Sequence, residues 1–322
     1  MLVIKMKQYI NDLKNGEFVD SLFSVKYKHP PREYTNGYMF KIGVSDKTGE
    51  VEITYWGGTN KDAITKIFRG FSENDVIHVV GIAGEYKGKL KIDINEDNGS
   101  IKITDTYEQE DFVAVTSKDI EEMYTEFKTF LEIIKDSHLK SLLDLFFEDE
   151  LFVKIFKKCP GAMYMHHGYV GGLLEHTLGV AKLCDQIFKI YPSLDHDLLI
   201  AGAILHDLGK IKEFDVSTNI QISEQGMLRG HIVLGEEMLL EKINKIPGFP
   251  DILKMKLSHM ILSHHGNLEY GSPKTPQFPE AAAVYFADEF DSKIFQYIKI
   301  KETAETDDFR IYTKRFGEMY LR

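Results

Sequence analysis

The sequence predicts a multi-domain α+β protein in which a small N-terminal β-barrel precedes an all-α domain. Apolar and polar residues alternate up to about residue 107, whereas apolar residues recur every three or four positions from Asp119 onward. A length of 322 residues suits roughly two domains. We expect a barrel over 1–107, a linker with connecting helices over 108–158, the main helical domain over 159–300 and a C-terminal extension over 301–322.

The strand signals of the first 107 residues come in a definite order. Residues 16–29 alternate up to Pro30, where we expect the first strand to break, and residues 37–58 hold two alternating runs around the turn Asp46–Gly49. Helical spacing follows over 60–71, and two more strands flank a glycine-containing turn over 75–94. This order fits a five-stranded OB-type barrel.

One face of this barrel is a candidate binding surface for a single strand. Lys41 and Trp56 lie opposite the predicted core face, where an indole could stack a base beside a positive charge. The alternative is that Trp56 packs under the neighbouring glycine loop or against the second domain. Lys26 and Tyr27, with Lys28, form a second candidate patch. The predicted core residues are Tyr38, Phe40, Ile42, Val44, Val51, Ile53 and Tyr55.

The rest of the chain reads as helices. Residues 119–158 contain two or three, and others are expected near 172–191, 196–209, 229–246, 251–265 and 279–298. A short alternating segment, 213–228, predicts a small hairpin between them. The first 18 residues look like a strand or helix rather than a signal peptide.

Composition narrows the class of protein. The net charge of -11 argues against a surface built for duplex DNA. Residues 1–107 hold 15 basic and 15 acidic residues, so the later part carries the whole surplus. No apolar stretch is long enough for a membrane span. With two cysteines, neither a disulfide framework nor a cysteine-rich zinc site is expected, and a cytoplasmic location is the default.

Histidines and aspartates in otherwise apolar helical segments predict a metal centre. Nine of the 12 histidines lie between residues 166 and 265. Burying such groups separately is costly, whereas a divalent transition-metal ion satisfies several at once. Nitrogen-rich ligands without sulfur favour Mn, Fe, Co, Ni or Zn over Mg. The candidate ligands are His176, His206, Asp207, His231, His264 and Asp288.

Further polar residues lie beside the predicted ligands in the sequence. Adjacent residues on a helix point about 100° apart, so we favour His264 as the ligand, with His265 facing the substrate or serving as the second ligand. Lys210 follows the His–Asp pair and could contact a substrate phosphate. His166 and His167 are as readily surface residues as phosphate contacts.

The order His176, His206–Asp207 and Asp288 resembles the metal-binding signature of the HD-domain phosphohydrolase superfamily, and His231 and His264 resemble the extra ligands of its two-metal members. The stretches HHGYVGGLLEHT, AGAILHDLGK, RGHIVLGEE and LSHHGNLEYGSP, together with the OB-like barrel, look like the YhaM-type 3′-to-5′ exoribonuclease family. The resemblance covers most of the chain.

This resemblance implies one ion on His176, His206, Asp207 and Asp288, and a second bridged by Asp207 to His231 and His264. It implies that two transition-metal ions, most readily Mn, supply a hydroxide that hydrolyses single-stranded RNA, or single-stranded DNA, to 5′-mononucleotides. We expect catalytic roles for Asp207, Lys210 and His265.

Other activities and properties stay open on the sequence alone. The alternatives are an HD-type nucleotide or cyclic-nucleotide phosphohydrolase, a di-iron HD oxygenase, and a non-catalytic binding module. Arg229 is the arginine nearest in sequence to the predicted ligands and is the candidate contact to the RNA backbone. Assembly into a homo-oligomer is compatible with the exposed aromatics expected of the helical part.

Overall fold

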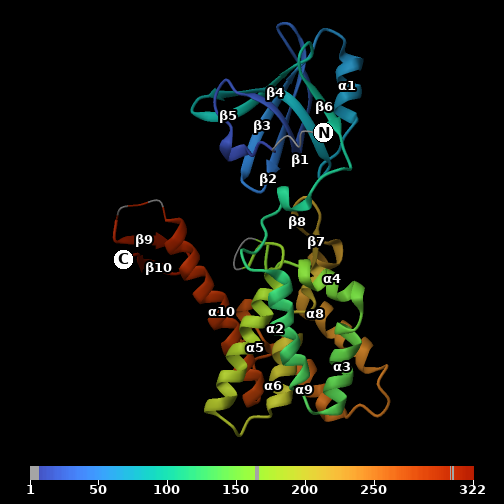
Figure 1. The fold of residues 1–322 in the computed structure, drawn as a ribbon, viewed down its shortest axis with the longest axis vertical. Helices are drawn as coiled ribbons and strands as arrows, with labels where there is room; N and C mark the ends of the chain where they lie inside the picture. The colour runs from blue at the N-terminus through green and yellow to red at the C-terminus, as the bar shows by residue number, and fades with distance from the viewer. Residues whose placement is uncertain (1–6, 164–166, 305, 307) are drawn as a thin grey trace. The chain divides into compact units, whose positions relative to one another are not determined.

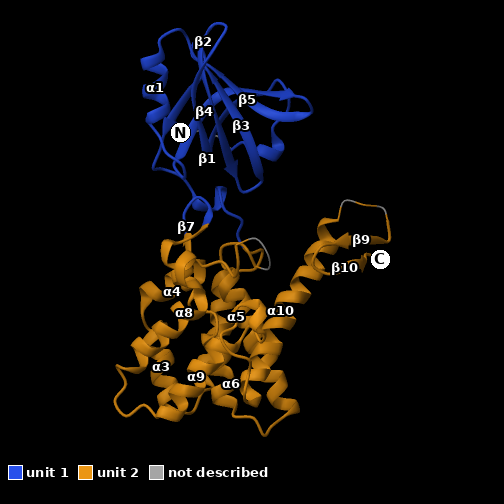
Figure 2. Cartoon of the chain, turned by 180° about the vertical axis from the view of Figure 1, so that it is seen from behind, with its two compact units in different colours: residues 1–115, 216–220 blue, residues 116–215, 221–322 orange. Residues whose placement is uncertain are grey.

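The computed structural model describes residues 7–163, 167–304, 306 and 308–322, and the chain divides into two compact units (Figures 1 and 2). Unit 1 comprises residues 1–115 and 216–220, and unit 2 comprises residues 116–215 and 221–322. Of the strand or helix expected over residues 1–18, residues 1–6 lie outside the described residues and Ile10–Asp12 form one 3-10 turn.

Unit 1 is a closed barrel with OB topology. Its strands follow the order β1 (Phe18–Tyr34), β2 (Gly37–Asp46), β3 (Gly49–Trp56), β5 (Lys89–Asn95) and β4 (Val76–Tyr86), and β4 pairs with β1 to close the ring. β3 and β5 are parallel, and α1 (Lys61–Arg69) connects β3 to β4. The five-stranded barrel is confirmed. A sixth strand, β6 (Ser100–Ile103), extends the sheet beside β4.

The central hairpin has the predicted register. Val44 pairs with Val51 and Ile42 with Ile53, and their side chains are buried in the barrel core. β1 does not break at Pro30 as expected. It continues to Tyr34, and its pairing with β2 is irregular between His29 and Arg32, where the prolines lie. A bulge there accommodates residues that cannot donate an amide hydrogen.

Unit 2 is built from helices, one short hairpin of its own and the outer residues of a second hairpin, whose residues 216–220 belong to unit 1. Among its described residues, no helix has the length and apolar content needed to span a bilayer. The hairpin β7 (Phe214–Val216) and β8 (Ile220–Ile222) matches the expected segment, whereas β9 (Arg310–Thr313) and β10 (Gly317–Tyr320) were not expected. The helices are α2 (Ile120–Glu132), α3 (Ser137–Phe147), α4 (Glu150–Lys158), α5 (Gly172–Ile190), α6 (His196–Leu205), α7 (Lys210–Glu213), α8 (Glu224–Ile243), α9 (Asp251–Ser263) and α10 (Pro279–Thr303).

Helix α6 lies at the centre of unit 2. Every residue from Leu198 to Leu205 is buried, and α6 packs against α5, α9 and α10. A helix that is apolar on all sides must be surrounded. The polar pair His206–Asp207 at its C-terminal end is therefore delivered into the interior, among the neighbouring helices.

Candidate metal centre

The predicted ligands converge at the C-terminal end of α6. Helix α5 carries His176, the end of α6 carries His206 and Asp207, and α8 carries His231. The end of α9 carries His264, and α10 carries Asp288.

Two glycines allow this convergence. A Cβ atom on Gly209 would lie only 1.9 Å from the His231 carbonyl oxygen, so only glycine permits so close an approach of α8. Within α8, Gly230 has a φ of 67°, and the resulting kink directly precedes His231.

The Asp207 carboxylate divides its two oxygens between two sets of imidazoles. Its Oδ2 lies 3.4 Å from His176 Nε2 and 3.3 Å from His206 Nε2. Its Oδ1 lies 3.6 Å from His231 Nε2 and 3.5 Å from His264 Nε2. Asp207 is 2% exposed. One buried carboxylate thus faces two separate groups of nitrogen donors.

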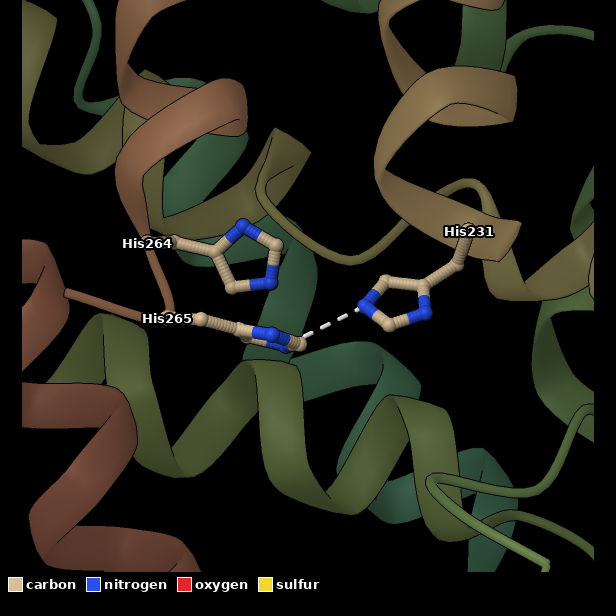
Figure 3. Close-up of side chains that lie close together, drawn as sticks. All are labelled: His231, His264 and His265. Atoms are coloured by element: carbon tan, nitrogen blue, oxygen red, sulfur yellow. Dashed lines mark hydrogen bonds between the residues drawn. The ribbon is translucent and has the colours of Figure 1, made fainter. Parts of the chain in front are cut away.

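Each set has a further member. Asp288 Oδ1 lies 3.2 Å from His176 Nε2, and His265 Nε2 lies 3.2 Å from His231 Nε2 (Figure 3). The donor atoms of His176, His206 and Asp288 all lie within 4.8 Å of one another, as do those of His231, His264 and His265.

The structure brings His264 and His265 to the same side, because both side chains turn toward His231 (Figure 3). The reason is that α9 ends at Ser263 and the chain turns at Gly266, which has a φ of 73°. The two histidines therefore lie at the terminus of α9, and which of them binds a metal stays a prediction.

Hydrogen bonds at Nδ1 orient the imidazoles. The Nδ1 atoms of His206, His264 and His265 lie 2.8, 2.7 and 3.0 Å from the carbonyl oxygens of Ala203, Ile261 and Tyr270. A carbonyl can only accept, so each Nδ1 is protonated and each Nε2 is an available donor for a metal.

Carboxylates hold the other two imidazoles. His231 Nδ1 lies 3.0 Å from Glu213 Oε2, and His176 Nδ1 lies 2.7 Å from Asp291 Oδ2. Sequence reasoning missed both acids. A signal existed for Asp291, which follows Asp288 by three residues in the predicted helix and so shares its face. No pattern marks Glu213.

Asp291 also contacts His167, which is buried rather than on the surface. His167 Nε2 lies 3.1 Å from Asp291 Oδ2, and its Nδ1 lies 2.9 Å from the Tyr169 hydroxyl. His167 has a φ of 52°, in the left-handed region that residues other than glycine rarely adopt. His166 lies outside the described residues.

The carboxylates at the centre stay ionised. Burial alone would raise the pKa of Asp207, but Lys210 and His206 hold that pKa well below its usual range. Burial alone would likewise raise the pKa of Asp288, but its hydrogen bond with His176 lowers it. The amino group of Lys210 lies 2.6 Å from Asp207 Oδ2, and this carboxylate raises the lysine pKa against the effect of burial.

The histidines differ in protonation. Burial lowers the pKa of His264, and burial with the neighbouring His264 lowers the pKa of His265 to about 4, which leaves both neutral near pH 7. Burial would also lower the pKa of His176, but hydrogen bonds with Asp288 and Asp291 raise it to about 10.

Two buried atoms support the presence of a cation. Asp207 Oδ1 and His264 Nε2 have no hydrogen-bond partner within the described part of the chain, yet they face each other at 3.5 Å. An unsatisfied buried carboxylate oxygen is expensive, and a divalent ion would satisfy both atoms together. The donor set therefore fits a metal ion.

A cavity of about 810 Å³ within unit 2 opens onto this centre. Asp207, His231, His265 and Asp288 line it. Lys210 and Lys293 also line it, and each pairs with a neighbouring carboxylate, Lys293 with Glu289. Its aromatic residues include Phe214, Tyr270, Tyr297 and Phe316.

Arg229 is not brought to this cavity. Its guanidinium Nη1 donates to Glu237 Oε2 at 2.9 Å, and Arg229 is absent from the described residues that line the cavity. Arg229 precedes the kink at Gly230 that comes directly before His231, and its contact with the RNA backbone stays a prediction.

The candidate binding face of the barrel is partly paired. Lys41 forms an ion pair with Glu52 at 2.5 Å, and Trp56 Nε1 donates to Asp93 Oδ1 at 2.8 Å. The edge of the Trp56 ring system meets Tyr34, with centroids 5.0 Å apart. These contacts fix the indole on the outer face.

The three residues of the second candidate patch have different surroundings in the structure. Lys26 lies 3.8 Å from Glu50, and Tyr27 is 41% exposed. Lys28 differs from them, because its amino group donates to the carbonyl oxygens of Phe68 and Phe71. The irregular pairing between Val25 and Tyr27 alters the simple alternation of side chains there.

The fold and the centre define the class of protein, an HD-domain phosphohydrolase that carries an OB-type barrel. The HD domain family model matches residues 173–293. The chain is 30% identical over 298 residues to the 3′-5′ exoribonuclease YhaM of Halalkalibacterium halodurans, which covers 91% of this chain and 89% of that protein. The YhaM of Shouchella clausii is 29% identical over 309 residues, 94% of this chain and 92% of that protein. The chain belongs to the YhaM 3′-5′ exoribonuclease family.

Among solved structures, the second OB-fold domain of replication protein A from Methanococcus maripaludis matches 32% of this chain and 99% of its own, with a TM-score of 0.26 and 18% identity.

Proposed function

We propose that this chain shortens single-stranded RNA from its 3′ end and releases 5′-mononucleotides, using two divalent transition-metal ions, most readily Mn²⁺. The arrangement of Asp207 carries the proposal, since its two oxygens face two separate sets of imidazoles within 3.3–3.6 Å. A bridging carboxylate between two donor sets is what a two-metal phosphodiesterase requires.

The contacts support two proposed ligand sets. The first consists of His176, His206, Asp207 and Asp288, and the second of Asp207, His231, His264 and His265. When bound, such a pair of cations activates water and stabilises the charge that develops on the phosphoryl group.

The protein's own groups prepare the site. Asp291 and Glu213 hold two imidazoles with Nε2 directed inward, and Lys210 neutralises part of the Asp207 charge. The amino group of Lys210 forms an ion pair with Asp207, so a direct contact between this lysine and a substrate phosphate stays a prediction. Hydrolysis breaks the bond between phosphorus and the 3′ oxygen of the penultimate nucleotide, so the terminal nucleotide leaves with its 5′ phosphate.

The barrel would hold the single strand through the face that carries Lys41 and Trp56. Lys26 and Tyr27 remain candidate contacts to the same single strand. Cleavage of single-stranded DNA and assembly into a homo-oligomer stay predictions. A cytoplasmic location is also a prediction, consistent with Cys159 and Cys184 being free thiols.

The test is product analysis with 3′-labelled single-stranded RNA, beside single-stranded DNA and a panel of nucleotides and cyclic nucleotides. With Mn²⁺ we expect labelled 5′-mononucleotide as the first product. Asp207→Ala should abolish release while the chain still binds RNA. Release of oligonucleotides, or activity confined to the nucleotide panel, would contradict the proposal.

A further inference from the structure

Part of the cavity wall comes from the C-terminal hairpin of unit 2. Arg315 and Phe316 lie in the turn between β9 and β10, and both line the cavity that Asp207 and Asp288 also line. A guanidinium and an aromatic ring are thus brought to the same space as the acidic centre.

The hairpin turn is held against α10. The Phe316 ring packs on Tyr297 of α10, with centroids 4.4 Å apart and an angle of 37° between the planes. Within the turn, the Phe316 backbone N–H donates to Thr313 Oγ1 at 3.0 Å, and Gly317 takes a φ of 69°. α10 also carries Asp288, so a single helix supports both the hairpin turn and one ligand of the centre.

The residue types suit the end of a nucleic acid strand. A guanidinium offers a planar pair of donors that matches a phosphate in a bidentate arrangement, which an ammonium cannot do. An aromatic face stacks a base without regard to its identity. Tyr297 is 41% exposed despite its contact with Phe316, so part of its ring remains accessible.

We propose that Arg315 binds a backbone phosphate near the 3′ end of the substrate and that the Phe316–Tyr297 pair receives a base of the same terminal segment. The inference rests on the proposed function and adds to it a substrate contact outside the HD ligand set. The C-terminal hairpin is then part of the active site rather than an appendage of the helical unit.

The test uses the full chain with Mn²⁺ and a triribonucleotide, a substrate that minimises the contribution of the barrel. Loss of a charge-assisted hydrogen bond should raise the KM of Arg315→Ala roughly tenfold or more, with a smaller change in kcat. Arg315→Lys should recover only part of the loss, because the bidentate geometry is missing. Phe316→Leu should raise KM, whereas Phe316→Trp should retain stacking.

Arg310→Ala is the matched control. Arg310 lies on β9 of the same hairpin, and its exposed side chain pairs with Glu318 at 3.6 Å. It should leave KM unchanged, and the melting temperature and Mn²⁺ content of all variants should match the wild type. An unchanged KM in Arg315→Ala, with an active wild type, overturns the inference alone. A wild type that releases no mononucleotide overturns the proposed function, and this inference with it.

Discussion

At the scale of single residues, Asp291 connects His176 of the first ligand set to the buried His167. Its Oδ2 contacts His176 Nδ1 at 2.7 Å and His167 Nε2 at 3.1 Å. The unusual backbone conformation of His167 costs on the order of 1 kcal/mol, and the surrounding contacts must hold it in place. The network is therefore positioned to fix the orientation and basicity of His176.

Asp291→Asn should weaken Mn²⁺ binding to the metal-free protein by roughly 10- to 100-fold, the usual effect of altering a partner of a metal-bound histidine. Calorimetric titration measures it. Asp185→Asn is the control, since Asp185 pairs with His196 at 3.2 Å near the opposite end of α6. Equal affinities for Asp291→Asn and the wild type would show that Asp291 does not support the ligand.

Metal uptake should release protons. His176 is an imidazolium at neutral pH because its pKa is raised to about 10, and a cation binds only after Nε2 loses its proton. Mn²⁺ affinity should therefore increase as the pH rises from neutrality toward about 10. Titrations in two buffers with different heats of ionisation should give different apparent enthalpies; identical enthalpies would argue against a protonated ligand.

At the scale of elements, the turn after α6 and helix α8 meet at two glycines. A Cβ on Gly209 would meet the backbone of His231 at 1.9 Å, whereas one on Gly235 would lie 3.3 Å from Gly209 N. The first contact forces the backbone apart and the second requires only a slight adjustment. The separation of Asp207 from His231 depends on this crossing.

Gly209→Ala should lower the free energy of unfolding by about 1–3 kcal/mol, the usual range for overpacking, and should reduce the bound Mn²⁺. Gly235→Ala is the control at the same crossing and should have the smaller effect on both. Denaturant unfolding and metal analysis of the purified variants provide the measurements. Equal losses of stability and of bound Mn²⁺ in the two variants would contradict the prediction that Gly209 is the more constrained position.

The regular elements were easier to predict from sequence than the ends of elements. The register of β2 with β3 follows from strict alternation around one turn, so Ile42 and Ile53 were placed correctly in the core. The C-terminal hairpin was missed because its strands have four residues each, too few for a periodic pattern. The roles of His264 and His265 were left open because the two residues follow the last residue of α9, Ser263.

At the scale of the whole molecule, the two units have separate cores and separate proposed tasks. Trp56→Ala should weaken binding of long single-stranded RNA by about 1–3 kcal/mol for each stacked base it loses, while kcat/KM on a triribonucleotide stays near the wild-type value. Fluorescence anisotropy and steady-state kinetics test the two halves of this prediction. Tyr191→Ala, an exposed aromatic of unit 2, is the control. Equal effects on long and short substrates would contradict the division.

The residues that converge at the candidate centre were predictable because histidines and aspartates stand out in apolar surroundings. Their orienting partners were harder to predict, since three of them are backbone carbonyls, which leave no signature in a sequence. The cavity wall at Arg315 depends on tertiary packing of a short terminal hairpin, which no local pattern encodes.

Residues 216–220 belong to unit 1 although they lie far from it in sequence, so the barrel cannot be produced by a single truncation without losing them. Ser24 Oγ donates to the buried Thr218 Oγ1 at 2.7 Å, and Asn219 Nδ2 donates to Asn74 Oδ1 at 2.9 Å. A truncation after residue 115 would remove these five residues and strip Ser24 of its acceptor. An isolated barrel should therefore be made as a fusion that adds residues 216–220 back, rather than by ending the chain at a single boundary.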